Sequence, residues 1–506
     1  MSQIRDYQHK SSPYLYSRVQ HACWGAFQAG YTISELGIAF GHLALLYDIH
    51  ESDQRNYCTL VVTILSVSAL ISAYLSQFLM HKMERRKFMI IADLFFLLAS
   101  GLTQINQWWV FMFARLVMGI SVGMNTSVIS LYIREISPDN MAGKTGALFQ
   151  ANVNLGIIFG FILNLPLKSV TNVNDVTDIW RLVFLFPAFF SVIRIFFMLF
   201  VYKIDTPYYY YRNHLNTLGR KAVEQIYKEK YVLSQEQIHL APGSVDFTDM
   251  STGDQTLINE SEQSYKNRLK VGMVTNFLQQ MCGNTYLAVY STGVLGIVTS
   301  DFYHMRSFVL GSYIFLFFVS TLGVSFNRKL ARKRYLVGGF LFCSVCQTGL
   351  AIIASFKDDV QNNSTLQFLL VLFLFFFYAA YNFSVGPVTS IYTSDILKDE
   401  GMSYSIVMNW LGNVISLTLF LNTQVYVNCI VFAASALCGF AFCSKYVVET
   451  RYMNFNDIQK TYQNNYEMNV KQQLDTSQVL NDSVNNNSIV SSLTSNNNNC
   501  IVNSKM

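Results

Sequence analysis

Apolar runs of about twenty residues, separated by short polar segments, recur along most of the chain. A helix of about 20 residues crosses the ~30 Å hydrocarbon core of a bilayer. The pattern therefore predicts an all-α membrane protein with about twelve transmembrane helices. They lie at 19–40, 57–80, 88–104, 108–133, 144–164 and 180–201, and then at 270–297, 307–326, 335–355, 365–394, 403–421 and 424–446.

Composition supports the lipid bilayer as the environment of this chain. Of its 506 residues, 52% are hydrophobic and only 13% are charged, whereas soluble domains carry roughly 25% charged residues. The net charge of +5 is small for this length, and Lys and Arg cluster in short loops. We therefore expect no nucleic-acid partner.

Two of the short loops are strongly basic, at 81–87 and 328–334. Because basic loops stay on the cytoplasmic side, we place both termini and the central polar segment in the cytoplasm. No apolar run precedes the first span, so we expect no cleaved signal peptide. The plasma membrane is the default location for such a multi-pass protein.

Each basic loop follows the second helix of a group of six, which predicts two similar bundles with a substrate site between them. The alternative is two unrelated bundles that share basic loops. We divide the chain into a cytoplasmic segment 1–18, a bundle 19–201, a cytoplasmic linker with surface helices 202–269, a bundle 270–446 and a cytoplasmic tail 447–506. The Asn-rich tail beyond about 465 has a disordered composition and is either inert or a binding segment for a cytoplasmic partner.

Uncharged amides recur inside the predicted spans. Amide groups both donate and accept hydrogen bonds, as do the hydroxyls of a polyhydroxylated neutral ligand, and an indole offers an apolar wall for a sugar ring. A single such amide is as readily explained by hydrogen bonding between helices. The residues concerned are Gln150, Gln279, Gln280, Asn409 and Asn413, with Trp410 among them.

Six short motifs follow one another in order along these spans. They are RLVMGISVG at 115–123 with LYIREISP at 131–138, WR at 180–181, DTP at 205–207, QQMCG at 279–283, NWLGN at 409–413 and VETR at 448–451. Together they resemble the sugar porter family of the major facilitator superfamily, particularly its facilitative glucose transporters. The resemblance implies two pseudo-symmetric six-helix bundles and transport of a hexose by alternating access.

The resemblance also implies which residues contact the sugar. It assigns this role to Gln150, Gln279, Gln280, Trp410 and Asn413. This sequence departs from the family pattern at other positions. Thr285, beside Asn284, stands where the family has an Asn after QQxxG, and Asn382 stands where the family has an acidic residue on the tenth helix. The expected ligand is a small neutral sugar or polyol, with a preference that differs from that of a glucose transporter.

Proton-coupled members of the family carry an Asp on the first helix beside the fourth-helix arginine, here Arg115. Thr32 takes the place of that Asp, and because a hydroxyl does not titrate near neutrality, facilitated transport is the simpler interpretation. Glu35 lies one turn further along the same face. It is either a carboxylate near the outer boundary or a relocated proton site partnered by Arg115.

The resemblance implies a charge network that closes the cytoplasmic side in one of the alternating states. Each member, taken alone, also fits a solvated loop residue that follows the positive-inside rule. Two family arginines of this network are replaced, by Ala142 and Met402. The matching residues are Arg85, Arg86, Glu135, Asp205, Arg332, Lys333, Asp395 and Glu449.

The sequence thus predicts a facilitative carrier for a hexose. A non-transporting sugar sensor and a proton-coupled sugar or polyol symporter are the alternatives. No nucleophile–base set or metal-ligand cluster stands out, so we expect neither an enzyme nor a bound cofactor or metal.

Overall fold

The computed structural model describes residues 13–464, except 37–38, 138, 168–175, 228–261, 290–306, 308–309, 316, 320–330, 357–359, 361–362, 398, 419–423, 452 and 454–456. The first part of the predicted N-terminal segment, most of the central linker and the Asn-rich tail therefore lie outside the described residues. Contacts divide the chain into two units, and both predicted bundles fall in the larger one, 1–257 with 269–452. The following description concerns this larger unit.

The first half of the chain forms long helices at each of the six predicted positions. Two shorter helices, α8 (Pro207–Arg212) and α9 (Asn216–Tyr227), follow them in the linker. The long helices are α1 (Pro13–Ser34) with α2 (Ala39–Leu46), α3 (Glu51–Lys82), α4 (Arg85–Leu102), α5 (Trp108–Ile136), α6 (Asp139–Asn164), and α7 (Ile179–Phe196) with the π-turn η3 (Phe197–Val201).

In the second half, each of the six remaining predicted spans also coincides with a helix, wholly or in its described part. An apolar helix, Leu310–Val319, covers part of the eighth span. The others are α11 (Glu262–Met281) with α12 (Asn284–Val289), α15 (Arg332–Ser355), α17 (Ser364–Ala380) with η4 (Tyr381–Val385) and α18 (Gly386–Ile396), α19 (Asp399–Thr418) and α20 (Val425–Tyr446).

Large apolar side chains cover the outside of these helices. Leu94, Phe189 and Val192 are each more than half exposed, and burying such side chains from water is worth about 1.5–3 kcal/mol each. Within the described residues, seven helices are long and apolar enough to cross a membrane, and the pair α1–α2, bent by 61°, makes an eighth. The exposed apolar surface is the surface that faces lipid.

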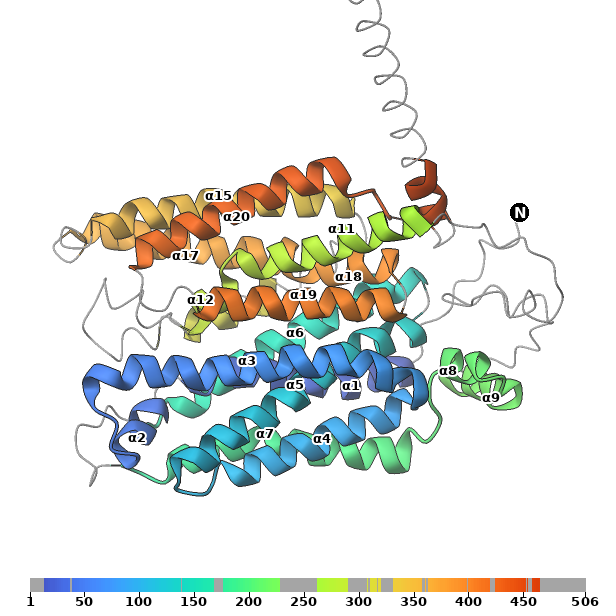
Figure 1. Ribbon diagram of the computed structural model, residues 1–506, viewed down its shortest axis with the longest axis horizontal. Coiled ribbons are helices and arrows are strands. Elements are labelled where there is room, and N and C mark those ends of the chain that lie inside the picture. Colours follow the sequence, from blue (N-terminus) through green and yellow to red (C-terminus); the bar gives the residue numbers. More distant parts are fainter. Residues whose placement is uncertain are drawn as a thin grey trace, which may run out of the picture. The chain divides into compact units, whose positions relative to one another are not determined.

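The helices of the first half lie together, as do those of the second half, and the two groups meet where α3 contacts α19 and α6 contacts α18 (Figure 1). Close packing of α3 on α5 depends on two glycines. A Cβ at Gly119 would lie 2.2 Å from the Leu65 carbonyl oxygen, and one at Gly123 would lie 2.2 Å from that of Ala69. The glycine spacing of the 115–123 motif therefore serves helix packing, as in other membrane helix pairs.

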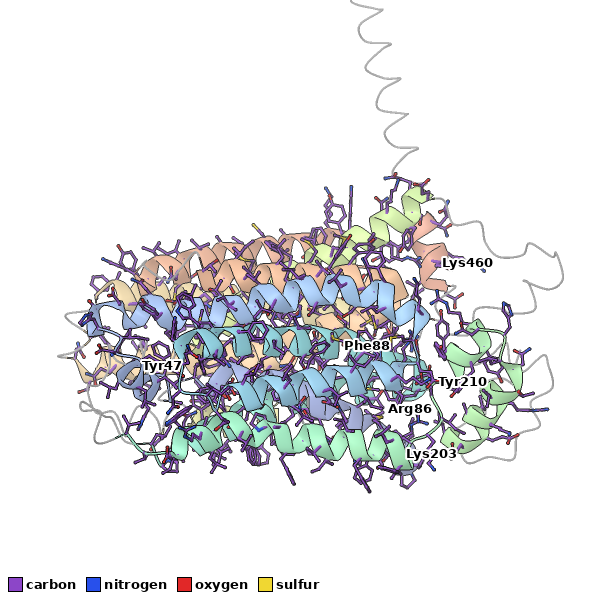
Figure 2. All side chains as sticks on the ribbon, turned by 60° about the horizontal axis from the view of Figure 1, so that its bottom comes forward. Tyr47, Arg86, Phe88, Lys203, Tyr210 and Lys460 are labelled. Atoms are coloured by element: carbon purple, nitrogen blue, oxygen red, sulfur yellow. The ribbon has the colours of Figure 1, made fainter. Side chains whose placement is uncertain are left out.

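One end of the helices carries the basic residues Arg85, Arg86, Lys87 and Arg332–Arg334, and we call it the basic end. Figure 2 shows Arg86, Lys203 and Tyr210 at this end and Tyr47 at the opposite end. The predicted cytoplasmic face is the basic end.

Candidate functional site

The second half of the chain holds a continuous series of hydrogen-bonded amides. Gln279 on α11 donates through Nε2 to the Gly386 carbonyl oxygen at 2.9 Å. Asn409 on α19 donates to Gln279 Oε1 at 2.8 Å, and Gln280 Nε2 donates to Asn409 Oδ1 at 3.1 Å. The helices α11, α18 and α19 are thereby joined through side chains rather than through apolar packing alone.

The series continues past a break in the seventh span. Gly283, with a φ of +83°, separates α11 from α12, and a glycine adopts this left-handed conformation at no steric cost. Thr285 Oγ1, on α12, donates to Gln280 Oε1 at 3.0 Å, and Asn413 Nδ2 donates to Thr285 Oγ1 at 3.2 Å. Asn284, the first residue of α12, is half-buried.

The series ends at an acceptor that lacks a donor. Asn413 is 6% exposed, and its Oδ1 has no hydrogen-bond partner among the described residues. Leaving a buried acceptor unpaired costs about 1–3 kcal/mol. A bound hydroxyl or water at this position would recover that energy.

Two side-chain hydrogen bonds join the second half of the chain to the first half. Asn154 on α6 donates to Oδ1 of Asn382 on η4 at 2.9 Å, and Gln150 Nε2 approaches Asn154 Oδ1 at 3.4 Å. Trp410 Nε1 donates to Thr126 Oγ1 on α5 at 3.2 Å. Of the residues predicted to contact substrate, Asn382 and Trp410 thus take part in hydrogen bonds between the two halves.

Sequence reasoning missed Asn154 and Thr126. The spacing of Gln150 and Asn154 was an available signal, because residues i and i+4 lie on one face of a helix. No such signal was available for Thr126, because what distinguishes it is a hydrogen bond from the Trp410 indole, 284 positions away in the chain.

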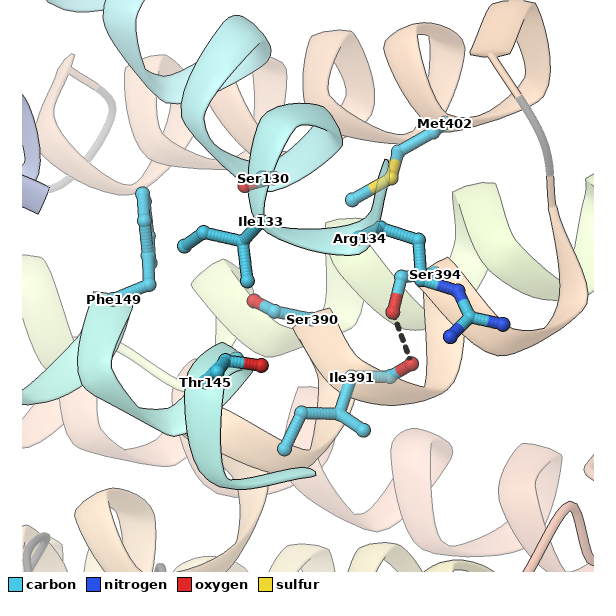
Figure 3. Close-up of a pocket in the computed structure, with 10 residues that line it drawn as sticks. Ser130, Ile133, Arg134, Thr145, Phe149, Ser390, Ile391, Ser394 and Met402 are labelled. Carbon is cyan, nitrogen blue, oxygen red and sulfur yellow. Dashed lines mark hydrogen bonds between the residues drawn. The ribbon is translucent and has the colours of Figure 1, made fainter. Parts of the chain in front are cut away.

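Toward the basic end, the two halves close over a cavity of about 30 Å³ (Figure 3). Ile133, Phe149, Ile391 and Met402 line it, together with Ser394, whose hydroxyl donates to the Ile391 carbonyl oxygen at 2.7 Å. A site for a drug-sized ligand is about 300–1,000 Å³. This cavity therefore has room for water but not for a sugar.

Glu35 and Arg115 form a fully buried ion pair between the first and fourth spans. Thr32, which occupies the family's acidic position, instead donates to the Ala29 carbonyl oxygen of its own helix at 2.8 Å. Glu35 Oε2, Arg115 Nε and Arg115 Nη2 are buried without hydrogen-bond partners among the described residues. The Glu35 side chain has 0% exposure, and its predicted partnership with Arg115 is present.

A second buried ion pair, between Asp93 and Arg194, was missed. Arg194 Nε and Nη2 donate to the two Asp93 carboxylate oxygens at 2.6 Å each. Arg194 Nη2 also donates to Asn125 Oδ1 at 2.6 Å, and its Nη1 donates to the Ala22 carbonyl oxygen at 3.1 Å. A charged residue within a predicted span is itself a signal, and it was present at both positions.

At the basic end, several of the predicted gate residues form ion pairs. Arg85 Nη2 pairs with Glu135 Oε1 at 2.8 Å, and Thr206 Oγ1 donates to Glu135 Oε2 at 2.6 Å. In the second half, Arg332 Nε pairs with Asp395 Oδ2 at 2.8 Å.

The remaining predicted gate residues differ in the contacts that they make. Glu449 accepts the backbone N–H groups of Arg332 and Lys333 at 2.9 and 3.1 Å, and so caps the start of α15. Arg86 contacts Glu84, at 3.3 Å, rather than another predicted member. Asp205 is fully buried, and burial together with the nearby Glu135 carboxylate raises its pKa to about 7.

Comparison with known proteins agrees with this architecture. The family model described as "Sugar (and other) transporter" matches residues 19–462, and the chain belongs to this family. Hexose transporter 1 of Plasmodium vivax is 23% identical over 456 residues, covering 85% of this chain and 89% of its own. The facilitated glucose transporter member 3 of solute carrier family 2 from Oryctolagus cuniculus is 23% identical over 489 residues, covering 90% and 93%.

Among solved structures, the proton:xylose symporter XylE bound to 6-bromo-6-deoxy-D-glucose superimposes with a TM-score of 0.74. It is 16% identical and covers 90% of this chain and 100% of its own. The all-α major facilitator fold predicted from the sequence is confirmed by this likeness. The chain is a multi-pass membrane transporter of the sugar transporter family.

Proposed function

We propose that this protein carries a hexose across the membrane by facilitated diffusion, through alternating access. The observation that carries the proposal is the amide series from Gln279 to Asn413, together with the Asn154–Asn382 hydrogen bond between the two halves of the chain. These groups lie where the halves meet, which is where a transporter of this architecture binds substrate.

The chemistry of the series favours a neutral, polyhydroxylated ligand. Its members are amides and one hydroxyl, each able to donate and to accept. A sugar hydroxyl that entered the series would replace one side-chain hydrogen bond with two of its own, at little net cost. The free Oδ1 of Asn413 supplies an acceptor, and the Trp410 indole supplies an apolar surface for a ring face.

The small cavity between the two halves fits a state of the alternation that is closed toward the basic end. For a sugar to leave there, Ile133 and Phe149 of the first half must separate from Ile391 and Met402 of the second. We expect the charge clusters Arg85–Glu135 and Arg332–Asp395 to influence the populations of the closed and open states.

The proposal also includes orientation and location. The basic end is the cytoplasmic face, both termini are cytoplasmic, and the protein resides in the plasma membrane. No catalytic reaction or cofactor is assigned to it.

The test is uptake of labelled D-glucose by proteoliposomes, with L-glucose as the stereochemical control and with and without an inward proton gradient. We expect stereoselective uptake that equilibrates and does not respond to the gradient. Uptake of neither isomer, by protein that is folded and correctly inserted, would contradict a hexose substrate and direct attention to other sugars and polyols. Saturable sugar binding without uptake would identify a sensor.

The Glu35–Arg115 pair favours a second candidate, a proton-coupled symporter. Glu35 is a buried carboxylate on the first span that faces the fourth-span arginine, which is where the resemblance places the acid of proton-coupled members, and one solved structure of this fold is titled a proton:xylose symporter. Sugar accumulation driven by the proton gradient in the same vesicles would establish this candidate in place of the uniporter.

A further inference from the structure

A lipid-facing groove in the second half of the chain plays no part in the site described above. It has a volume of about 540 Å³ and lies between α15, α17, η4 and the helix Leu310–Val319. Phe342 and Phe376 line it and are 48% and 43% exposed, so the groove opens toward the hydrocarbon of the bilayer. Gly338 lies on its floor, and a Cβ placed there meets no atom within 4 Å.

Polar groups occur where the groove reaches the basic end. Arg334, in the first turn of α15, lines the groove and is exposed. Its neighbour Arg332 is engaged by Asp395, whereas the structure shows no ion pair for Arg334 within the described residues. Tyr335, also in the lining, is only 9% exposed, and its hydroxyl has no hydrogen-bond partner among the described residues.

We propose that this groove binds an anionic phospholipid, with one acyl chain along Gly338 and Phe342 and its phosphate at Arg334. The exposed guanidinium of Arg334 complements the phosphate and the net negative charge of such a lipid. The groove runs from Arg334 to Phe342, about 12 Å at 1.5 Å per residue. That length fits within one leaflet of a ~30 Å hydrocarbon core.

The groove adjoins the amide series through the tenth span. Phe383, which faces Tyr335 with 5.6 Å between ring centroids, belongs to η4, a π-turn of the kind that often marks functional sites. Asn382 lies in the same turn, and Gly386, whose carbonyl accepts from Gln279, follows it. A lipid in the groove therefore contacts the segment that positions two residues of the predicted substrate site.

The test is a lipid-binding measurement that does not depend on transport. Protein in phosphatidylcholine vesicles is given a photoactivatable phosphatidylserine, and cross-linked peptides are located by mass spectrometry. We expect cross-links to residues 334–342 and 376–384 that exceed those formed by a matched phosphatidylcholine probe. Arg334→Gln should weaken phosphatidylserine labelling about fivefold, the equivalent of about 1 kcal/mol per basic residue near a membrane surface.

Gly338→Trp provides the steric test, because the open space at this position lets the indole fill the groove without displacing the backbone. We expect it to abolish labelling of the groove. Gly101→Trp is the matched control, since Gly101 on α4 is likewise exposed and a Cβ placed there also meets no atom within 4 Å. Equal labelling in the Gly338→Trp and Gly101→Trp proteins, or equal labelling by the two lipids, would overturn the proposal.

Discussion

The buried Asp93–Arg194 pair yields a sharp stability prediction. Asp93→Asn preserves the shape of the side chain but removes its charge and one of its two acceptors. Arg194 Nη2 or Nε, each now 2.6 Å from a carboxylate oxygen, then faces an NH₂ group. Removing one partner of a buried ion pair costs about 3–5 kcal/mol, because the other charge stays buried without compensation.

The loss should be visible as a lower melting temperature of the purified protein. With an unfolding entropy of about 2.1 cal/mol/K per residue, a unit of this size shifts by about 1 °C per kcal/mol, so we expect Asp93→Asn to melt about 3–5 °C lower than the parent. The double variant Asp93→Leu with Arg194→Met removes both charges and leaves mainly Asn125 Oδ1 without its donor, at a cost of about 1–3 kcal/mol. A double variant as unstable as the single one, or an Asp93→Asn protein that melts with the parent, would refute this account of the pair.

Three further predictions concern transport and pH. If transport is facilitated, Glu35→Gln should change the rate of sugar uptake by the same factor at mildly acidic and at neutral pH. Selective loss of the proton-driven part of the uptake would show that Glu35 carries the proton. Asn154→Ala should raise the KM for sugar about 2- to 12-fold, the equivalent of a hydrogen bond worth about 0.5–1.5 kcal/mol. The control Asn152→Ala breaks a hydrogen bond to Gln20 within the first half and should leave KM unchanged. Equal effects of the two substitutions would argue against a role for the Asn154–Asn382 hydrogen bond in sugar binding. Burial raises the pKa of Asp205 from 3.8 to about 7. The folded state therefore binds this proton more tightly than the unfolded state, and it loses stability as the pH rises through this range. Asp205→Asn should melt higher than the parent above pH 7 and equally near pH 3.8, and parallel pH profiles of the melting temperature for the two proteins would exclude Asp205 as the source of this pH dependence.

Much of the substrate site could be predicted because its residues occur in short motifs. Gln279 and Gln280 are adjacent in the chain, and Asn409, Trp410 and Asn413 occupy one turn and a half of a single helix. An amide inside an apolar span must find a partner, so residue type and location already restricted what these side chains do. How they pair with one another was not predictable, because each bond depends on where α19 lies against α11.

The missed residues share a different property. Asn154 and Thr126 acquire their roles from partners more than two hundred positions away, and Arg194 acquires its role from Asp93, on a helix that is not its sequence neighbour. The choice between an exposed Glu35 and one paired with Arg115 was likewise left open. Such pairings are set by helix rotation and depth, which a one-dimensional pattern does not contain.

The sequence by itself determined the membrane location, the number of helices and their approximate ends, because a bilayer demands long apolar segments with internally satisfied backbones. It also determined which end is basic and which amides are available for a neutral ligand. Only the tertiary structure decided which amides join across the two halves, how small the cavity between the halves is toward the basic end, and which buried charges neutralise each other. Those outcomes depend on packing between helices remote in the chain, where a shift of one turn changes every partner.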